Sequence, residues 1–321
     1  MKCKWIKKLT AGIIFLAAVG SLRGCQKAAT SENLVRDIEV NMTSVESAEE
    51  NQIVKLQMGD GDSAISQESN LDIEMTRNPA SVHRKGQQKT NMAGTKETQE
   101  MESYQVEEDG KTVIYSGTDE AWEKNAVEEK ETSSQQTVLF DGLQNLSGAF
   151  NVSQDLATVN KEECFELTGT ISGTQFQETF ADTLKALLGE DSSDLSGWNL
   201  QASEDEENNE ELQQKLNNVK VDCVIDIYRS NILPAKITFD LTDYLKAAGE
   251  ENAQVTSYTL EVTFVSYNDT KKIKVPKAVK ESAKDNGEDE AENSTDEMLE
   301  YMEDVDHVVY FQRPDTNFES H

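Results

Sequence analysis

Three histidines are the side chains best suited to acid–base chemistry in this chain of 321 residues. A hydrolytic triad needs a nucleophile, a base and an orienting group that the fold brings together. His83 lies in a polar, strand-like stretch, His307 and His321 lie near the C-terminus, and no G-x-S-x-G sequence supplies a nucleophile. Each histidine is therefore expected at the surface, and the sequence predicts that the protein is not an enzyme.

Metal ligands with a suitable spacing are missing from the sequence as well. No pair of histidines or cysteines has the spacing of a zinc site. Residues 59–63 contain part of a calcium-loop pattern, but the further oxygen ligands and the distal glutamate are out of register, which favours a polar turn. Because 61 residues are acidic, paired carboxylates have no diagnostic value. We expect no metal ion and no cofactor.

The most distinctive chemistry belongs to Cys25, which follows a basic start and a short apolar run. Four lysines precede residues 11–20, an uncharged and mainly apolar stretch that is too short to cross a bilayer as a helix. These parts are typical of a secretory signal and predict that residues 1–24 are removed. The sequence "LRGC" that ends at Cys25 resembles the lipobox of bacterial lipoproteins, although a small residue is usual where Arg23 stands.

The lipobox resemblance implies a membrane anchor. In that family the cysteine thiol is alkylated with a diacylglyceryl lipid, with acyl chains such as palmitate, and the signal is cut before the cysteine. Cys25 would then begin a lipoprotein on the extracytoplasmic face of the bacterial cell membrane, in the cell envelope, with residues 25–31 as its tether. The alternative is an ordinary secreted protein that is cut nearby.

Net charge excludes nucleic acid as a partner. The full chain has a formal charge of −31, and without residues 1–24 it has 25 basic and 61 acidic residues, a net charge of −36. A surface of this sign repels nucleic-acid phosphates and anionic lipid headgroups. Eleven acids and no basic residue lie within residues 285–306, so residues 285–321 are expected to form an acidic, largely disordered tail.

Alternation of apolar and polar residues is the strongest structural signal in residues 32–284, the expected globular domain. A hairpin turn is expected at residues 109–110, and another hairpin joins Ile227 to Ile237. A further hairpin is predicted to turn at residues 268–269 and to return as far as Pro276. The alternation itself predicts half-buried strands over residues 71–75, 164–171, 221–228, 235–241 and 258–264.

Amphipathic stretches predict helices that can cover one face of this sheet. Residues 173–189 have an apolar stripe, a capping-box spacing at Thr174 and Gln177, and a glycine at the end. Weaker helical patterns occur at residues 138–146, 209–219 and 241–249. The expected fold class is therefore α+β, with a curved antiparallel sheet covered by a few helices.

Two cysteines remain in the expected domain. Cys164 is out of phase with the apolar residues of its strand, whereas Cys223 is in phase with those of its own strand. The phases favour opposite faces of the sheet and two free thiols, although an exported protein can also form a disulfide.

Several segments together resemble a known group of proteins. They include "NLDIEMTRNP", "EECFELTGTISG", "RSNILPAKITFDLT" and, most specifically, the spacing of "FVSYNDTKKIKVP" that begins at Phe264 and ends at Pro276. With the lipobox, these segments look like uncharacterised lipoproteins of Gram-positive bacteria, which are similar to the outer-membrane lipoprotein carrier fold and to the mycobacterial LppX and LprG lipoproteins. The resemblance implies an unclosed half-barrel with helices at its mouth.

By the same analogy, the resemblance implies an apolar ligand, such as a lipid, between the sheet and the helices. The alternative is a surface interaction or structural lipoprotein with a solid core, whose partner would be a basic protein or a cell-wall component. The residues expected to face a ligand are Phe165, Leu167, Ile171, Phe176, Phe180, Leu184, Ile225, Ile227, Ile237, Phe239, Leu260, Val262 and Phe264.

Overall fold

The computed structural model describes most of the chain between residues 29 and 285. The described ranges are 29–59, 64–92, 94–118, 121–127, 140, 142–188, 206–248 and 255–285. The expected signal, Cys25 and the acidic tail beyond residue 285 lie outside them, and so does the side chain of Leu184. In these ranges, no helix combines the length and the apolar character needed to cross a membrane.

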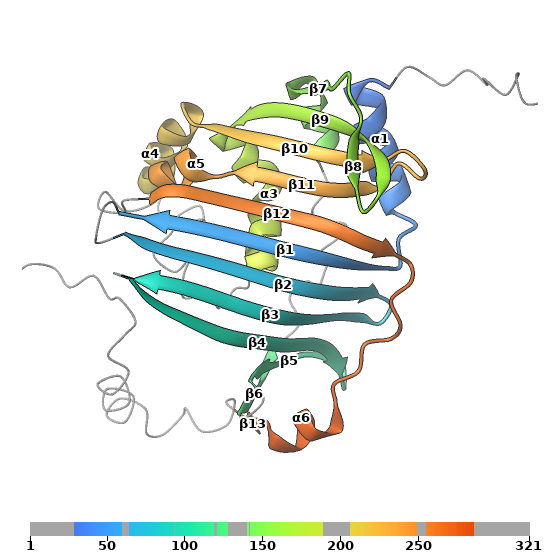
Figure 1. Cartoon of the computed structure of the whole chain (residues 1–321), viewed down its shortest axis with the longest axis vertical. Coiled ribbons are helices and arrows are strands. Elements are labelled where there is room, and N and C mark those ends of the chain that lie inside the picture. The colour runs from blue at the N-terminus through green and yellow to red at the C-terminus, as the bar shows by residue number, and fades with distance from the viewer. Residues whose placement is uncertain are drawn as a thin grey trace, which may run out of the picture.

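Thirteen strands of the described chain form one curved sheet that does not close into a barrel (Figure 1). Their spatial order is β13-β6-β5-β4-β3-β2-β1-β12-β11-β10-β9-β7, and β8 also pairs with β9. Neighbours pair antiparallel except β13 and β6. The strands are β1 (Ser47–Met58), β2 (Ile65–Arg77), β3 (Ala80–Met92), β4 (Thr95–Glu108), β5 (Lys111–Gly117), β6 (Trp122–Val127), β7 (Phe150–Val152), β8 (Ala157–Val159), β9 (Glu162–Ser172), β10 (Lys220–Tyr228), β11 (Pro234–Asp240), β12 (Val255–Tyr267) and β13 (Lys284–Asp285).

All the described helices except α6 cover one face of this sheet, which we call the inner face, whereas α6 packs through Val279 on the opposite face. In Figure 1 the viewer looks at the opposite, outer face, and α3 passes behind β12 and β1. The predicted fold class, an unclosed antiparallel sheet with a few helices, is therefore confirmed. The helical segments are α1 (Ser31–Met42), η2 (Leu143–Ala149), α3 (Gly173–Leu188), α4 (Glu206–Asn217), α5 (Thr242–Ala248) and α6 (Lys277–Ser282).

The start of α3 shows a capping box, but not at the predicted residues. The backbone N–H of Gln175 donates to Oγ of Ser172 at 3.1 Å, and the backbone N–H of Ser172 donates to Oε1 of Gln175 at 3.0 Å. This reciprocal pair satisfies amides that the first turn of a helix leaves without partners. Thr174, which was expected to cap the helix, instead donates its hydroxyl to Oδ1 of Asn217 in α4.

The chain after β12 differs from the predicted hairpin. Residues 268–276, which we call the strap, do not return as a strand but cross the outer face and lead into α6 (Figure 1). Ile273 and Val275 of the strap are buried against Tyr104, Trp122 and their neighbours in a small outer-face core. The apolar residues of the expected return strand are thus buried by packing and not by strand pairing.

The predicted opposite orientation of the two described cysteines is confirmed. Cys223 belongs to the main core on the inner face, while Cys164 belongs to a separate cluster with Val159 and Tyr228. Both are buried free thiols. Burial raises the pKa of both thiols.

Candidate functional site

The structure brings the residues expected to face a ligand together on the inner face and on α3. Eleven of them are buried in the main core, and Phe165 is partly buried against it. Leu184 belongs to α3, but its side chain lies outside the described part. The eleven are Leu167, Ile171, Phe176, Phe180, Ile225, Ile227, Ile237, Phe239, Leu260, Val262 and Phe264. Their role in ligand binding remains a prediction.

One end of this set is closely packed. The ring of Phe176 lies 5.3 Å from that of Phe239 and 5.0 Å from that of Tyr244, both in edge-to-face geometry. Phe180 also approaches Phe239, with a centroid distance of 5.1 Å. Aromatic rings at these separations are in direct contact, so the start of α3 is fastened onto β11.

The apolar inner face continues past this packed region onto β1 and β2. On β1, Val54, Leu56 and Met58 are partly buried and pack against the main core. Leu71 of β2 lies opposite Gln52 and is also partly exposed. Here the inner face offers apolar surface that the described chain does not bury completely.

A polar row interrupts the apolar inner face beside these residues. The strand register places Glu50 of β1 next to Ile73 of β2, and Ile73 next to Arg84 of β3. On its other side, Glu50 lies opposite Phe264 of β12. Glu50 and Arg84 are thus two strands apart on one face, which corresponds to roughly 10 Å between their backbones.

Glu50 has an unusual environment for a carboxyl group. It is only 3% exposed, and its Oε1 has no hydrogen-bond partner. Burial raises the pKa of Glu50 from 4.5 to about 7, and the nearby charge of Arg84 opposes that shift. Burial also lowers the pKa of Arg84. A buried acceptor without a partner requires an explanation, such as a bound water or ligand.

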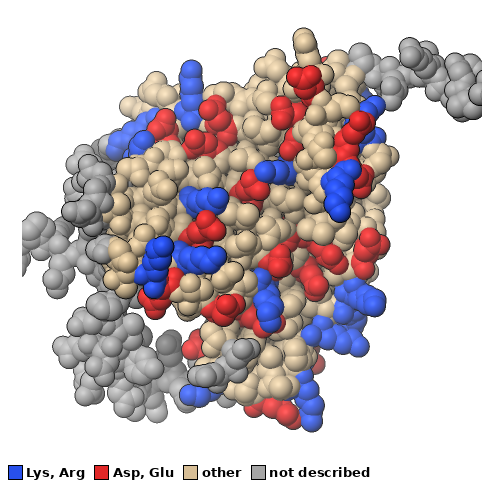
Figure 2. Space-filling model, in the orientation of Figure 1, with Lys and Arg blue, Asp and Glu red and all other residues tan. Residues whose placement is uncertain are grey.

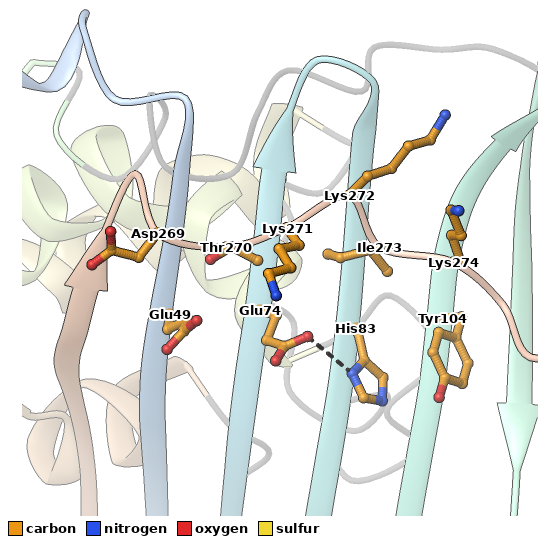
Figure 3. A pocket seen from close by; sticks show the side chains of 10 residues that line it. All are labelled: Glu49, Glu74, His83, Tyr104, Asp269, Thr270, Lys271, Lys272, Ile273 and Lys274. Atoms are coloured by element: carbon orange, nitrogen blue, oxygen red, sulfur yellow. Dashed lines mark hydrogen bonds and ion pairs between the residues drawn. The ribbon is translucent and has the colours of Figure 1, made fainter.

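A pocket of about 470 Å³ lies on the outer face, between the sheet and the strap (Figure 3). The register aligns Glu49, Glu74, His83 and Tyr104 in one row across β1 to β4, and this row forms the floor of the pocket. The strap lines the other side from Asp269 to Lys274. The pocket therefore presents charges of both signs.

Hydrogen bonds fix the floor of this pocket. Nε2 of His83 lies 2.9 Å from Oε1 of Glu102, which also accepts a hydrogen bond of 2.8 Å from the hydroxyl of Tyr104. The rings of His83 and Tyr104 are stacked with 4.3 Å between their centroids. Burial alone would raise the pKa of Glu102, but the hydrogen bonds from His83, Tyr104 and Lys85 outweigh burial and lower this pKa. This network gives His83, Tyr104 and Glu102 hydrogen-bond partners within the protein, which is typical of residues with a structural role.

On the outer face, the described residues carry charges of both signs. In Figure 2 acidic and basic side chains are interspersed over the face that the view shows. Among the described residues, no group of three or more histidine, cysteine or acidic side chains is placed to hold a metal ion. The partly exposed apolar residues of β1 and the buried Glu50 make the inner face the candidate binding site.

No pattern in the sequence predicted a role for Glu50 or Arg84, or the pocket around His83. Glu50 and Arg84 lie in strands whose inner faces mix polar and apolar residues, so no alternation marked them. His83 was expected at the surface, and it lies on the outer face as a partly buried residue paired with Glu102. A signal for Glu50 was present only in the register, which a single sequence does not show.

Comparison with solved structures gives distant similarities that span nearly the whole of each relative. LprF from Mycobacterium bovis is 12% identical over 77% of this chain and 96% of that chain, with a TM-score of 0.42. Lipoprotein LppX from Mycobacterium tuberculosis is 14% identical over 76% and 98%, with a TM-score of 0.39. A LolA superfamily protein from Nitrosomonas europaea is 10% identical over 78% and 97%, with a TM-score of 0.21.

These neighbours are of the kinds that the sequence resemblance named. No curated protein matches the chain. A family model, however, matches residues 30–284, nearly all of the described part and most of the chain. The protein thus belongs to the family described as "Family of unknown function (DUF6612)".

Proposed function

We propose that this protein is a non-enzymatic lipoprotein of the bacterial cell envelope that binds a lipid or another apolar ligand between the inner face of its sheet and the helices. The observation that carries the proposal is the continuation of the apolar inner face beyond the packed core, as the partly exposed Val54, Leu56 and Met58. Removing apolar surface from water contributes roughly 25 cal/mol per Å². A ligand that covers these side chains would therefore gain most of its affinity from burial.

The described thiols support a binding role over catalysis. A reactive cysteine needs a lowered pKa and access to its substrate. Cys164 and Cys223 are both buried, and burial raises the pKa of each. Neither thiol is suited to act as a nucleophile.

The expected anchor is a lipid on Cys25, which lies outside the described residues. If Cys25 carries the anchor, a Cys25→Ser variant expressed in a Gram-positive host will leave the membrane fraction and appear in the medium. An Arg23→Ala variant is the matched control, because it brings the sequence closer to the lipobox pattern and should stay in the membrane. A Cys25→Ser protein that remained membrane-bound would contradict this part of the proposal.

The test of ligand binding is native mass spectrometry of the protein, released gently from its own cells and not treated with organic solvent. A co-purified lipid, seen as a mass above that of the polypeptide and lost on denaturation, is the expected result. Protein that carries no such mass, and that also fails to take up lipid from vesicles, would contradict the proposal.

The second candidate is an interaction or structural lipoprotein with a solid core. The close packing of Phe176 and Phe180 on Phe239 favours it at that end of the inner face. Its partner would be basic, given the acidic net charge of the chain. Partner capture that weakens as salt is raised, together with an absence of bound lipid, would support this second function.

A further inference from the structure

We infer that the inner-face ligand is an anionic amphiphile with a carboxylate head, such as a long-chain fatty acid, and that Arg84 and Glu50 bind this head. The inference rests on the proposed function, because it names the ligand class of the same surface. Three features carry it: the shared row of Glu50 and Arg84, the unpartnered oxygen of Glu50, and the apolar residues along β1.

The carboxyl group of Glu50 is the first feature. A buried polar atom is costly unless it is hydrogen-bonded, yet Oε1 of Glu50 has no partner among the described residues. In its neutral form this carboxyl group donates one O–H bond, which a carboxylate on the ligand accepts. The two carboxyl groups then share one proton, as closely placed acids do.

Arg84 provides the positive charge that a carboxylate head needs. It lies on the same face as Glu50, with only Ile73 between them across the strands, and its charge is felt at Glu50. A guanidinium group matches the two oxygens of a carboxylate in a bidentate geometry. With one anionic head, one neutral Glu50 and one guanidinium, the group has no net charge, which suits a buried position.

The apolar tail of such a ligand has a defined path. Val54, Leu56 and Met58 follow Glu50 on the same face of β1 at every second residue after Gln52. The distance along the strand from Glu50 to Met58 is roughly 27 Å, eight residues at the rise of an antiparallel strand. A long acyl chain fits along this length, whereas a small polar anion would leave it uncovered.

The test uses the full mature protein, freed of lipid, and two probes that differ only in the head: palmitate and methyl palmitate. We expect palmitate to bind wild-type protein at least tenfold more tightly at pH 6.5 in calorimetric titrations. An Arg84→Gln variant should lose that tenfold preference and keep its affinity for the ester. A Lys85→Gln variant is the control, because Lys85 points to the outer face, where its Nζ donates to Glu102 at 3.1 Å, and it should bind both probes as wild type does.

A pH series on the wild type gives a second readout that does not require a variant to fold. Raising the pH from 6 to 8 removes the shared proton, so affinity for palmitate should fall at least threefold while affinity for the ester stays constant. A Glu50→Gln variant should not show this fall. Equal binding of palmitate and its ester to wild type would overturn the head assignment and leave the proposed function standing, whereas failure of both probes to bind would count against the proposed function itself.

Discussion

Cys164 and Cys223 lie on the neighbouring strands β9 and β10, yet their side chains are on opposite faces of the sheet. A disulfide requires Cβ atoms about 4 Å apart that point toward each other. We therefore predict that both thiols stay free in the exported protein. Alkylation after denaturation without reductant should label both cysteines, and native protein should react slowly because both are buried. Labelling only after reduction would contradict the orientation.

The raised pKa of Glu50 predicts a specific dependence of stability on pH. Its folded-state pKa of about 7 lies above the 4.5 of an unperturbed glutamate, so the folded protein holds an extra proton between these values. Stability from this group is intact below pH 4.5 and is lost as the pH rises through 7. The shift corresponds to about 3 kcal/mol.

The measurement is the free energy of unfolding of wild type and Glu50→Gln between pH 4.5 and 8.5. The free energy of unfolding of the Glu50→Gln variant, relative to that of wild type, should increase by about 3 kcal/mol as the pH rises. Asp226 is a second acid whose pKa is raised, to about 6, first by burial. An Asp226→Asn variant that removed all of the wild-type slope would show that Glu50 is not its source.

The fold could be predicted from sequence wherever a strand buries one face and exposes the other. β9, β10, β11 and β12 show clean alternation because their inner rows belong to the main core. β1 was missed, since Glu50 and Gln52 share an inner row with Val54 and Leu56 and break the pattern. The residues that hide this strand from sequence analysis are the ones that make its inner face a candidate site.

The strap illustrates a different limit of sequence analysis. The chain bends at Asn268, which has a φ of 62°, but the predicted hairpin with its return strand is absent. Ile273 and Val275 alternate as strand residues do, and either pairing or packing satisfies that pattern. Only the position of Trp122 and Tyr104, distant in sequence, decides in favour of packing.

Asn268 should stabilise the strap in two separable ways. Its left-handed conformation suits asparagine or glycine better than other residues. Its Oδ1 also accepts a hydrogen bond of 2.7 Å from the backbone N–H of Glu46. Asn268→Ala loses both contributions and should cost about 2 kcal/mol in chemical denaturation, whereas Asn268→Gly keeps the conformation and should cost about 1 kcal/mol. Equal losses for alanine and glycine would show that the backbone conformation carries no penalty.

Phe239 should be one of the residues that hold the helices on the sheet. It contacts both Phe176 and Phe180 of α3 and is 2% exposed. A Phe239→Ala variant should lose about 4 kcal/mol of unfolding free energy, from lost burial and the cavity left behind. Val265→Ala is the control: Val265 is 54% exposed on β12 and should change stability by about 0.5 kcal/mol or less. A small effect at Phe239 would mean that α3 is not fastened there.

Gly86 marks a point where two neighbouring strands come unusually close. A Cβ at Gly86 would lie 2.0 Å from the carbonyl oxygen of Asn70 and 2.9 Å from Cα of Leu71, both backbone atoms of β2. Because backbone in mid-sheet cannot rotate away as a side chain can, Gly86→Ala should force β2 and β3 apart and cost on the order of 3 kcal/mol.

Gly148→Ala is the matched control for Gly86→Ala. A Cβ at Gly148 would meet no atom within 4 Å, and the residue does not have a positive φ. Its stability should therefore stay within about 0.5 kcal/mol of wild type.

Since Gly86 lies two residues from Arg84 on the same face of β3, the displaced strand should also carry Arg84 away from Glu50. Gly86→Ala should then reduce the preference for palmitate over its methyl ester more than the affinity for the ester itself. A Gly86→Ala protein with wild-type stability would show that the sheet can relax at this point without loss.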